Sequence, residues 1–111
     1  MLSRSSRLHQ RADFRAATRL GRRVGSAGVV LHAHLDPTDP RPLVGFVVGR
    51  TVGPAVTRNR VRRRLQHIVA ARLPQLPPGD RLVVRATPGA AGYSSAALAE
   101  SLDAALVKAY R

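Results

Sequence analysis

The sequence predicts a small single-domain protein of the α+β class, an α/β sandwich in which helices pack against one sheet. The chain has 111 residues, which is enough for one hydrophobic core and too few for two. Hydrophobic residues make up 44% of it, so it can bury a core and does not fit the composition of a disordered polycation. Segments with helix and strand periodicity follow one another in the order α-β-β-α-β-α. No apolar run approaches the ~20 residues that a membrane span needs, so we expect no membrane partner.

The first predicted helix covers residues 8–20 and ends at Gly21, because glycine readily adopts the left-handed conformation of a helix C-cap. Arginines recur along it every three or four residues, which places three of them on one face: Arg11, Arg15 and Arg19. The opposite face is expected to be buried and carries Ala16, Ala17 and Leu20. Phe14 lies between the two faces. It is therefore either a core residue or an exposed ring that can stack on an unpaired base.

Two strands are predicted at Val29–Leu35 and at residues 43–49, where β-branched and apolar residues predominate. The segment between them, residues 36–42, contains three prolines and two aspartates, so we expect an antiparallel hairpin with a long loop. The two-residue period of the first strand puts His32 and His34 on one face, where we expect them to be half-exposed. Two histidines are too few ligands for a tetrahedral metal site, and none is predicted.

The most informative segment is the helix predicted over residues 53–73, in which Pro54 suits the first turn. Apolar residues at helical spacing form a stripe for burial, namely Val61, Leu65, Ile68 and Val69. Basic residues lie opposite, at Arg60, Arg63, Arg64 and His67, with Arg58 and Arg62 on the flank. Five arginines within residues 58–64 repel one another, and the helix has no acid. The alternative is a solvated charged face, but such faces normally mix signs, so we favour binding to phosphate groups.

The rest of the chain supplies a third strand and a last helix. A turn rich in proline is expected at residues 74–80, a strand at residues 81–86 and a loop at residues 87–92. Ser94 or Ser95 can cap the last helix, whose leucines fall on one face: Leu98, Leu102 and Leu106. This helix is nearly neutral, so we expect it to be structural.

The charge is concentrated in two blocks. The formal net charge is +13, with seven Arg and one Asp in residues 1–23 and seven Arg and no acid in residues 50–73. Residues 1–7 are expected to form a flexible basic arm. Two basic patches on one small domain indicate a polyanionic partner, and arginine suits phosphates because its planar fork binds them bidentately. Lys108 is the only lysine, and a biased genome composition would produce the same preference for arginine.

The chain has no cysteine, which excludes disulfides, thiolate zinc sites and cysteine nucleophiles and favours a cytoplasmic location. The Arg-rich start also imitates an organellar transit peptide. Against that interpretation, the basic character returns at residues 50–72, well inside the folded part.

Two adjoining motifs resemble the signature of the bacterial ribonuclease P protein component. They are Gly45-Phe-Val-Val-Gly-Arg and Val52-Gly-Pro-Ala-Val-Thr-Arg-Asn-Arg-Val-Arg-Arg-Arg-Leu65. The pair Asp13-Phe14, the following Gly21-Arg-Arg and the strand Val29-Val-Leu-His also fall where that family has its equivalents. The resemblance covers essentially the whole chain. It implies an additional short strand near residues 23–26 and an unusual left-handed β-α-β crossover around the Arg-Asn-Arg helix, against the general rule for such connections.

The resemblance implies a function in tRNA 5′ maturation. Proteins of this family are non-catalytic subunits of an endoribonuclease, in which a large RNA with magnesium removes the 5′ leader of precursor tRNA. The predicted partners are therefore ribonuclease P RNA and precursor tRNA, with no small-molecule substrate, and magnesium is expected to act through the RNA. The protein is expected to have no catalytic residue of its own, because its six acids are scattered along the chain.

Residue roles follow from the same resemblance. Contacts to the catalytic RNA are implied for Arg58, Asn59, Arg60, Arg62, Arg63 and Arg64. Contacts to the single-stranded leader are implied for Phe14, Arg11, Arg15, His32 and Arg50. Three positions depart from the family pattern, since Thr18 and His32 stand where aromatic residues are common and Thr51 where a basic one is.

Two other classes of function compete with this interpretation. A small ribosomal or general RNA-binding protein would fit the size and charge equally well, and only the Arg-Asn-Arg helix with its flanking pattern favours ribonuclease P. A DNA-binding module ranks last, because the basic helix has no second helix beside it at helix-turn-helix spacing.

Overall fold

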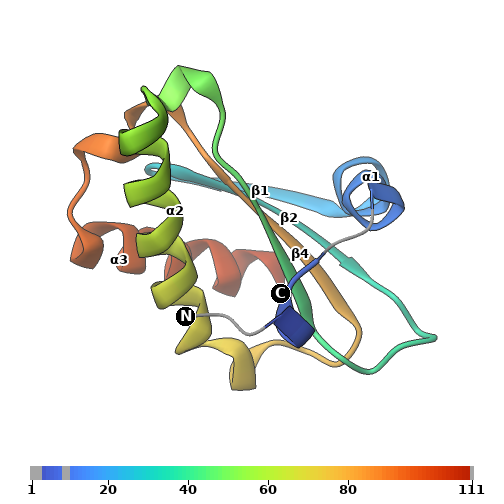
Figure 1. Ribbon diagram of the computed structural model, residues 1–111. Coiled ribbons are helices and arrows are strands. Elements are labelled where there is room, and N and C mark those ends of the chain that lie inside the picture. Colours follow the sequence, from blue (N-terminus) through green and yellow to red (C-terminus); the bar gives the residue numbers. More distant parts are fainter. Residues whose placement is uncertain (1–3, 9–10, 111) are drawn as a thin grey trace.

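The computed structural model describes residues 4–8 and 11–110, which form a four-stranded sheet with helices on both faces (Figure 1). Its main elements are α1 (Arg11–Leu20), β1 (Arg22–Ser26), β2 (Val29–Leu35), β3 (Leu43–Val47), α2 (Ala55–Ala70), β4 (Asp80–Ala86) and α3 (Ser95–Ala109). Short 3-10 turns lie at Arg4–Ser6, Arg50–Val52, Leu73–Gln75 and Pro88–Gly92. The predicted α+β class and element order are confirmed, and β1 is the additional strand that the resemblance implied.

The strands lie side by side in the order β1-β2-β4-β3. β1 pairs with β2, and β2 with β4, in antiparallel orientation, while β3 and β4 are parallel and are connected through α2. The predicted hairpin between β2 and β3 is therefore wrong, because β4 lies between them. The long loop packs instead on the turn before β4, where the Asp36 amide donates to the Gly79 carbonyl at 2.7 Å and the Gly79 amide to the Pro40 carbonyl at 3.0 Å.

The hairpin that does form joins β1 to β2. Ser26 pairs with Val29, so only two residues make the turn. Gly28 has φ +84°, a left-handed conformation that residues with a side chain rarely adopt and that suits the tight turns of hairpins.

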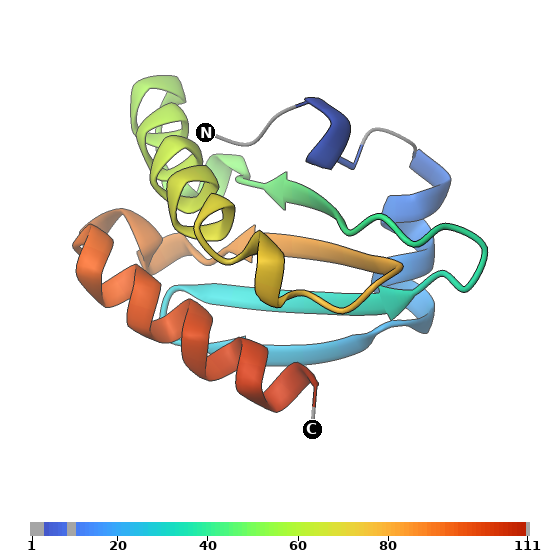
Figure 2. The ribbon, with the colours of Figure 1, turned by 90° about the horizontal axis from the view of Figure 1, so that it is seen from below.

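The larger part of the core lies between the sheet and the pair α2 and α3, which cover the same face (Figure 2). Alternate strand residues point into it, among them the fully buried Leu31, Leu82 and Val84. The predicted stripe of α2 and the leucine face of α3 are both buried there, and both predictions are confirmed. Complete burial of each such side chain contributes about 1.5–3 kcal/mol, so this layer fixes the position of α2 along the sheet.

α2 departs from the predicted pattern at its C-terminal end, whereas the start of α3 agrees with the predicted cap at Ser94 or Ser95. α2 stops at Ala70 and not at residue 73, where the Leu73–Gln75 turn with its proline takes over. Gln66 is buried with the apolar stripe, which its polarity did not predict. At the start of α3 the Ser94 hydroxyl accepts a hydrogen bond from the Ala97 amide at 3.1 Å, so Ser94 is the cap.

The opposite face of the sheet is covered by α1 (Figure 1). Ala17 of α1 is fully buried there together with Val83 of β4 and Leu8. The predicted start of the helix at residue 8 is wrong, because the Leu8 amide donates to the Val44 carbonyl at 2.9 Å and extends the edge of the sheet. Leu20, expected in the buried face, is 74% exposed, whereas Ala17 of the same predicted face is fully buried.

The predicted basic arm covers residues 1–7, of which residues 1–3 lie outside the described part. Arg4–Ser6 form a 3-10 turn, and Arg7 makes a bridge to Val44 of β3. No helix among residues 4–8 and 11–110 is long and apolar enough to span a membrane.

Candidate nucleic-acid interface

The arginines of α2 have no acidic partner within the described part of the chain. Ion pairs are made by Arg41, Arg72 and Arg81, with Asp36, Asp39 and Asp103 as their partners. None is made by the five arginines of residues 58–64, although they share about two turns of one helix. Because like charges at this spacing repel each other, the helix carries electrostatic strain that an external anion would relieve.

These arginines do not all face the same way, since the helix distributes them around the edge of its buried stripe. Arg60 and Arg63 are exposed, whereas Arg58, Arg62 and Arg64 are half-buried. Two of the half-buried ones are held by neutral acceptors. Arg62 donates to the side-chain oxygen of Asn59 at 3.1 Å, and Arg64 donates to the backbone carbonyl of Tyr93 at 3.2 Å.

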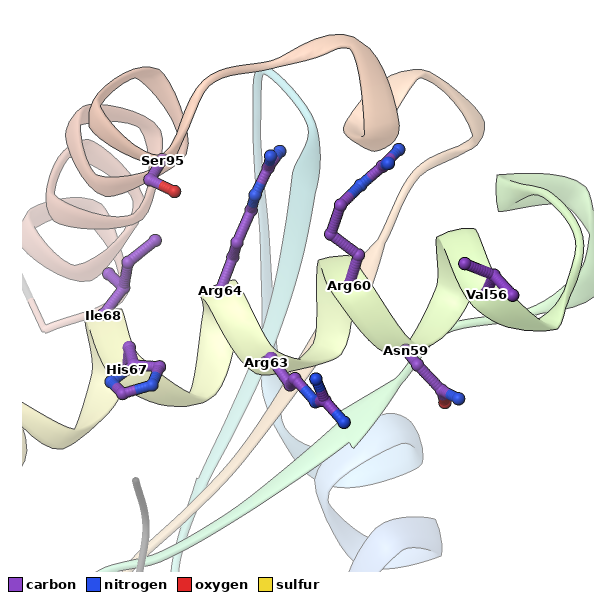
Figure 3. Close-up of a pocket in the computed structure, with 8 residues that line it drawn as sticks. All are labelled: Val56, Asn59, Arg60, Arg63, Arg64, His67, Ile68 and Ser95. Carbon is purple, nitrogen blue, oxygen red and sulfur yellow. The ribbon is translucent and has the colours of Figure 1, made fainter.

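One set of side chains lines a cavity of about 600 Å³ between α2 and the start of α3 (Figure 3). Arg60 and Arg64 extend side by side toward the segment before α3, while Arg63 and Asn59 point to the other side of the helix. Ser95, the first residue of α3, lies above Ile68 at one end of the cavity.

The other side of α2 meets the edge of the sheet. Arg62 and the buried Gln66 line a small cavity of about 150 Å³ together with Phe14, Gly45 and Phe46. Side chains from α1, β3 and α2 are thus brought together here. The sequence predicted Arg62 for the catalytic RNA and Phe14 for the leader, and the structure makes them neighbours.

The sequence left open whether Phe14 is a core residue or an exposed ring. In the structure it is partly both. It is half-buried and packs at the edge of the cluster formed by Leu8, Ala17 and Val83. Its ring lies directly over Gly45, where an added Cβ would come within 2.4 Å of the Phe14 Cζ atom. Any larger residue at position 45 would displace the ring, so this glycine sets the depth at which Phe14 sits. The residue as a whole is only half-buried, so part of its surface is exposed.

His32 differs from the prediction of a half-exposed histidine. Its side chain lies in the centre of the sheet, between Arg23 of β1 and Val83 of β4, and the residue is only 6% exposed. Burial lowers the pKa of His32, and the positive charges of Arg85 and Arg23 lower it further. Neither ring nitrogen has a hydrogen-bond partner among the described residues. The ring is thus kept neutral, with an unused donor and an unused acceptor.

Two residues of this sheet face were missed by the sequence analysis. Arg23 pairs across the strands with His32, and Arg85 of β4 lies on the same face, opposite Val47 of β3. The signal for Arg85 was present, because it alone interrupts the apolar run of its strand and the two-residue period points it away from Leu82 and Val84. Arg23 could not be found in this way, because its pairing with His32 depends on β1, a strand that the local sequence barely supports.

The other predicted leader residues occupy two separate places. Arg11 and Arg15 are exposed on α1, the helix that also carries Phe14. Arg50 is exposed in the turn Arg50–Val52 that leads into α2, so it belongs with the start of that helix.

Together, the fold and these surfaces define a class of protein: a small basic α+β domain that presents one unpaired arginine helix, and an adjoining sheet face, to a polyanion. Comparison with known proteins makes this specific. A family model described as Ribonuclease P matches residues 2–110. The chain is 53% identical over 104 residues to the ribonuclease P protein component of Acidothermus cellulolyticus, a match that spans 93% of this chain and 87% of that protein.

A second relative and a solved structure agree. The ribonuclease P protein component of Streptomyces griseus is 49% identical, over 96% of this chain and 93% of its own. The fold is that of the Staphylococcus aureus RNase P protein, with a TM-score of 0.86, 20% identity and coverage of 97% and 100% of the two chains. The chain therefore belongs to the ribonuclease P protein family. Its function is that of the protein subunit of the ribonuclease P endoribonuclease, a ribonucleoprotein of tRNA processing, and the ribosomal alternative is not supported.

Proposed function

We propose that this protein contacts ribonuclease P RNA through the arginines of α2 and the 5′ leader of precursor tRNA through the sheet face beside α1. The observation that carries the proposal is the set of α2 arginines without an acidic partner among the described residues. A protein gains nothing in stability from such crowding. It gains affinity for RNA, because each phosphate neutralised releases bound counterions.

The contacts to the catalytic RNA are assigned to Arg58, Asn59, Arg60, Arg62, Arg63 and Arg64. Arg60 and Arg63 are exposed and can form bidentate contacts with phosphate oxygens. Arg62 and Arg64 are already oriented by one hydrogen bond each, so less side-chain freedom is lost when their remaining donors bind.

The leader contacts are assigned to Phe14, Arg11, Arg15, His32 and Arg50, to which we add Arg23 and Arg85. The exposed part of the Phe14 ring offers a surface for one unpaired base. Arg23 and Arg85 supply positive charge next to His32. The two ring nitrogens of His32 are buried and unsatisfied, so they exchange hydrogen bonds with a base or a ribose hydroxyl only when the side chains that cover the ring move aside on binding.

Catalysis is assigned to the RNA with magnesium, in the cytoplasm. The donor set of this chain does not fit a catalytic metal centre, which needs several carboxylate or histidine ligands in one place. Within the described residues no three such side chains come together, and Asp36 and Asp39 are engaged by Arg81. The protein without RNA should not cleave precursor tRNA at any magnesium concentration, and specific cleavage by an RNA-free preparation would overturn this assignment.

The test of the α2 contacts is the joint replacement of Arg58, Arg60 and Arg63 by Ala. The fold should persist, because none of the three belongs to the buried stripe. Affinity for ribonuclease P RNA should fall steeply, and the slope of log K against log salt should drop by roughly 0.7–0.9 for each lost phosphate contact. An unchanged slope with a folded variant would show that these arginines are not phosphate ligands.

The test of the leader contact is a pair of substitutions at Phe14. Phe14→Ala should weaken binding of precursor tRNA by the reconstituted holoenzyme by roughly 1–3 kcal/mol, the usual range for base–aromatic stacking. Binding of mature tRNA, which has no leader, should not change. Phe14→Leu keeps most of the packing over Gly45 but offers no aromatic face. Equal weakening for both tRNAs, or a large loss of thermal stability in the Leu variant, would assign Phe14 to the core alone.

A further inference from the structure

The cavity between α2 and α3 has a shape that contact with an RNA backbone does not require. A phosphate backbone can be bound by arginines on a flat or convex surface. Here the surface is hollowed to about 600 Å³, within the range of 300–1,000 Å³ that is usual for small-molecule sites. The hollow adjoins the arginines of α2, so its occupant must be compatible with their charge.

The lining is apolar at both ends and cationic along its length. Ile68 closes one end and Val56 the other, and Val56 is 78% exposed although it is a β-branched aliphatic residue. Between them Arg60 and Arg64 extend in the same direction (Figure 3). None of the residues that line the cavity is a carboxylate, so the surface is complementary to an anion that also carries an apolar, flat group.

Arg64 is fixed in a way that suits stacking. Its Nη1 atom donates to the Tyr93 carbonyl, which anchors the guanidinium at the wall formed by the segment before α3. A guanidinium held in this way presents a planar face, and unpaired bases stack on such planes in RNA-binding proteins. The Ser95 hydroxyl at the mouth of the cavity can donate to or accept from the edge of a base.

We propose that this cavity is a nucleotide subsite, which takes one unpaired nucleotide of the bound RNA with its base in the hollow and its phosphate at Arg60. The proposal rests on the proposed function, since it names what one side of α2 recognises. It separates the roles of neighbouring residues: Arg63 and Asn59, which also line the cavity but point away from the segment before α3, contact backbone only, whereas Arg64 and Ser95 recognise a base.

The first experiment uses free nucleotides, so it does not depend on ribonuclease P RNA. The isotopically labelled protein is titrated with the four nucleoside 5′-monophosphates and, separately, with inorganic phosphate at matched ionic strength, while backbone amide NMR signals are followed. We expect nucleotides to shift the signals of Arg64, Ile68 and Ser95 and phosphate to leave Ile68 and Ser95 unchanged. Equal shifts with phosphate, or nucleotide shifts confined to other parts of the protein, would overturn the proposal.

The second experiment fills the cavity without changing the charge. Ser95→Leu places a larger apolar side chain at its mouth, and Ala96→Leu is the matched control, because Ala96 is exposed on the same turn and does not line the cavity. Ser95→Leu should weaken binding of ribonuclease P RNA by roughly 5- to 150-fold, the loss expected for one stacked base, and Ala96→Leu should bind as the unmodified protein does. One nucleotide of the RNA should also lose its protection from chemical modification only in the Ser95 variant.

The outcomes distinguish this proposal from the one on which it rests. Full binding and unchanged protection with Ser95→Leu would overturn the nucleotide subsite and leave the arginine contacts intact. Failure of the unmodified protein to bind ribonuclease P RNA would overturn the proposed function, and the titration with mononucleotides would still decide what the cavity binds.

Discussion

Arginines occur in two contrasting settings in this protein. At the corner where the long loop meets β4, Arg81 is 3% exposed, lies 3.1 Å from a carboxylate oxygen of Asp39 and donates to the Arg41 carbonyl at 2.8 Å. Along α2, five arginines lie close together without an ion pair in the described structure. The same residue type is therefore used at the corner to hold the chain to itself and on α2 to present charge outward.

The contrast shows why net charge alone is a poor guide to an RNA-binding surface. The acids of the corner hold their protons weakly, since hydrogen bonds from Thr38 lower the pKa of Asp36 and hydrogen bonds from Arg41 lower that of Asp39. Their negative charge is matched locally, so this end of the molecule contributes little to attraction of RNA. What identifies the interface is where positive charge is left without a partner.

The largest effect on stability is expected at Arg81. Arg81→Met leaves Asp36, Asp39 and the Arg41 carbonyl without their common donor. Arg81 is buried but both carboxylates are partly exposed, so the loss should be about 2–4 kcal/mol, somewhat less than the roughly 3–5 kcal/mol of a fully buried pair. Denaturant unfolding should show this loss, while the folded variant should bind ribonuclease P RNA normally. Arg85→Met on the same strand is the control for stability, because Arg85 is exposed and makes no ion pair in the described residues. Equal destabilisation by both substitutions would contradict the view that Arg81 stabilises the fold and that arginines without an ion pair do not.

A smaller effect, with a defined pH dependence, is expected at Asp80. This residue is fully buried and accepts a hydrogen bond from the Tyr110 hydroxyl at the end of α3. Burial raises its pKa from 3.8 to about 6, so between those pH values the folded state binds more protons than the unfolded state. The contribution of Asp80 to the free energy of unfolding therefore decreases as pH rises from about 4 to above 6.

Asp80→Asn isolates this contribution, since the amide keeps the shape and can still accept from Tyr110. The Asn variant should be more stable than the unmodified protein at pH 8, by roughly 1–3 kcal/mol, and the advantage should disappear near pH 4. A difference in the free energy of unfolding that does not vary between pH 4 and 8 would contradict this assignment.

The sequence predicted the helices and strands themselves better than it predicted which of them lie next to one another in the fold. The stripe of α2 and the leucine face of α3 depend on residues within one helix, and periodicity alone located both. The hairpin expected between β2 and β3 failed because β4, more than thirty residues further along the chain, supplies the partner for both strands. No local signal distinguishes adjacent strands that pair from adjacent strands that are separated by a later one.

The candidate site shows the same limit. The composition of α2 indicated a phosphate-binding helix, but its two sides could be told apart only once α3 and β3 were in place. His32 was expected to be half-exposed because alternation assigns a face and cannot show that the face is covered. The cavity beside Ser95 required the start of α3, a helix that its neutral composition marked as merely structural.

Two matched single substitutions test most directly whether RNA binding uses arginines without an internal partner. Arg63→Gln and Arg41→Gln each remove one exposed arginine and one unit of charge, but only Arg41 is paired, with Asp39 at 2.8 Å. The slope of log K against log salt for ribonuclease P RNA should fall by roughly 0.7–0.9 with Arg63→Gln and stay unchanged with Arg41→Gln. Equal decreases of this slope in the two variants would contradict the account. RNA affinity would then depend on the net charge of the protein and not on which arginines lack an acidic partner.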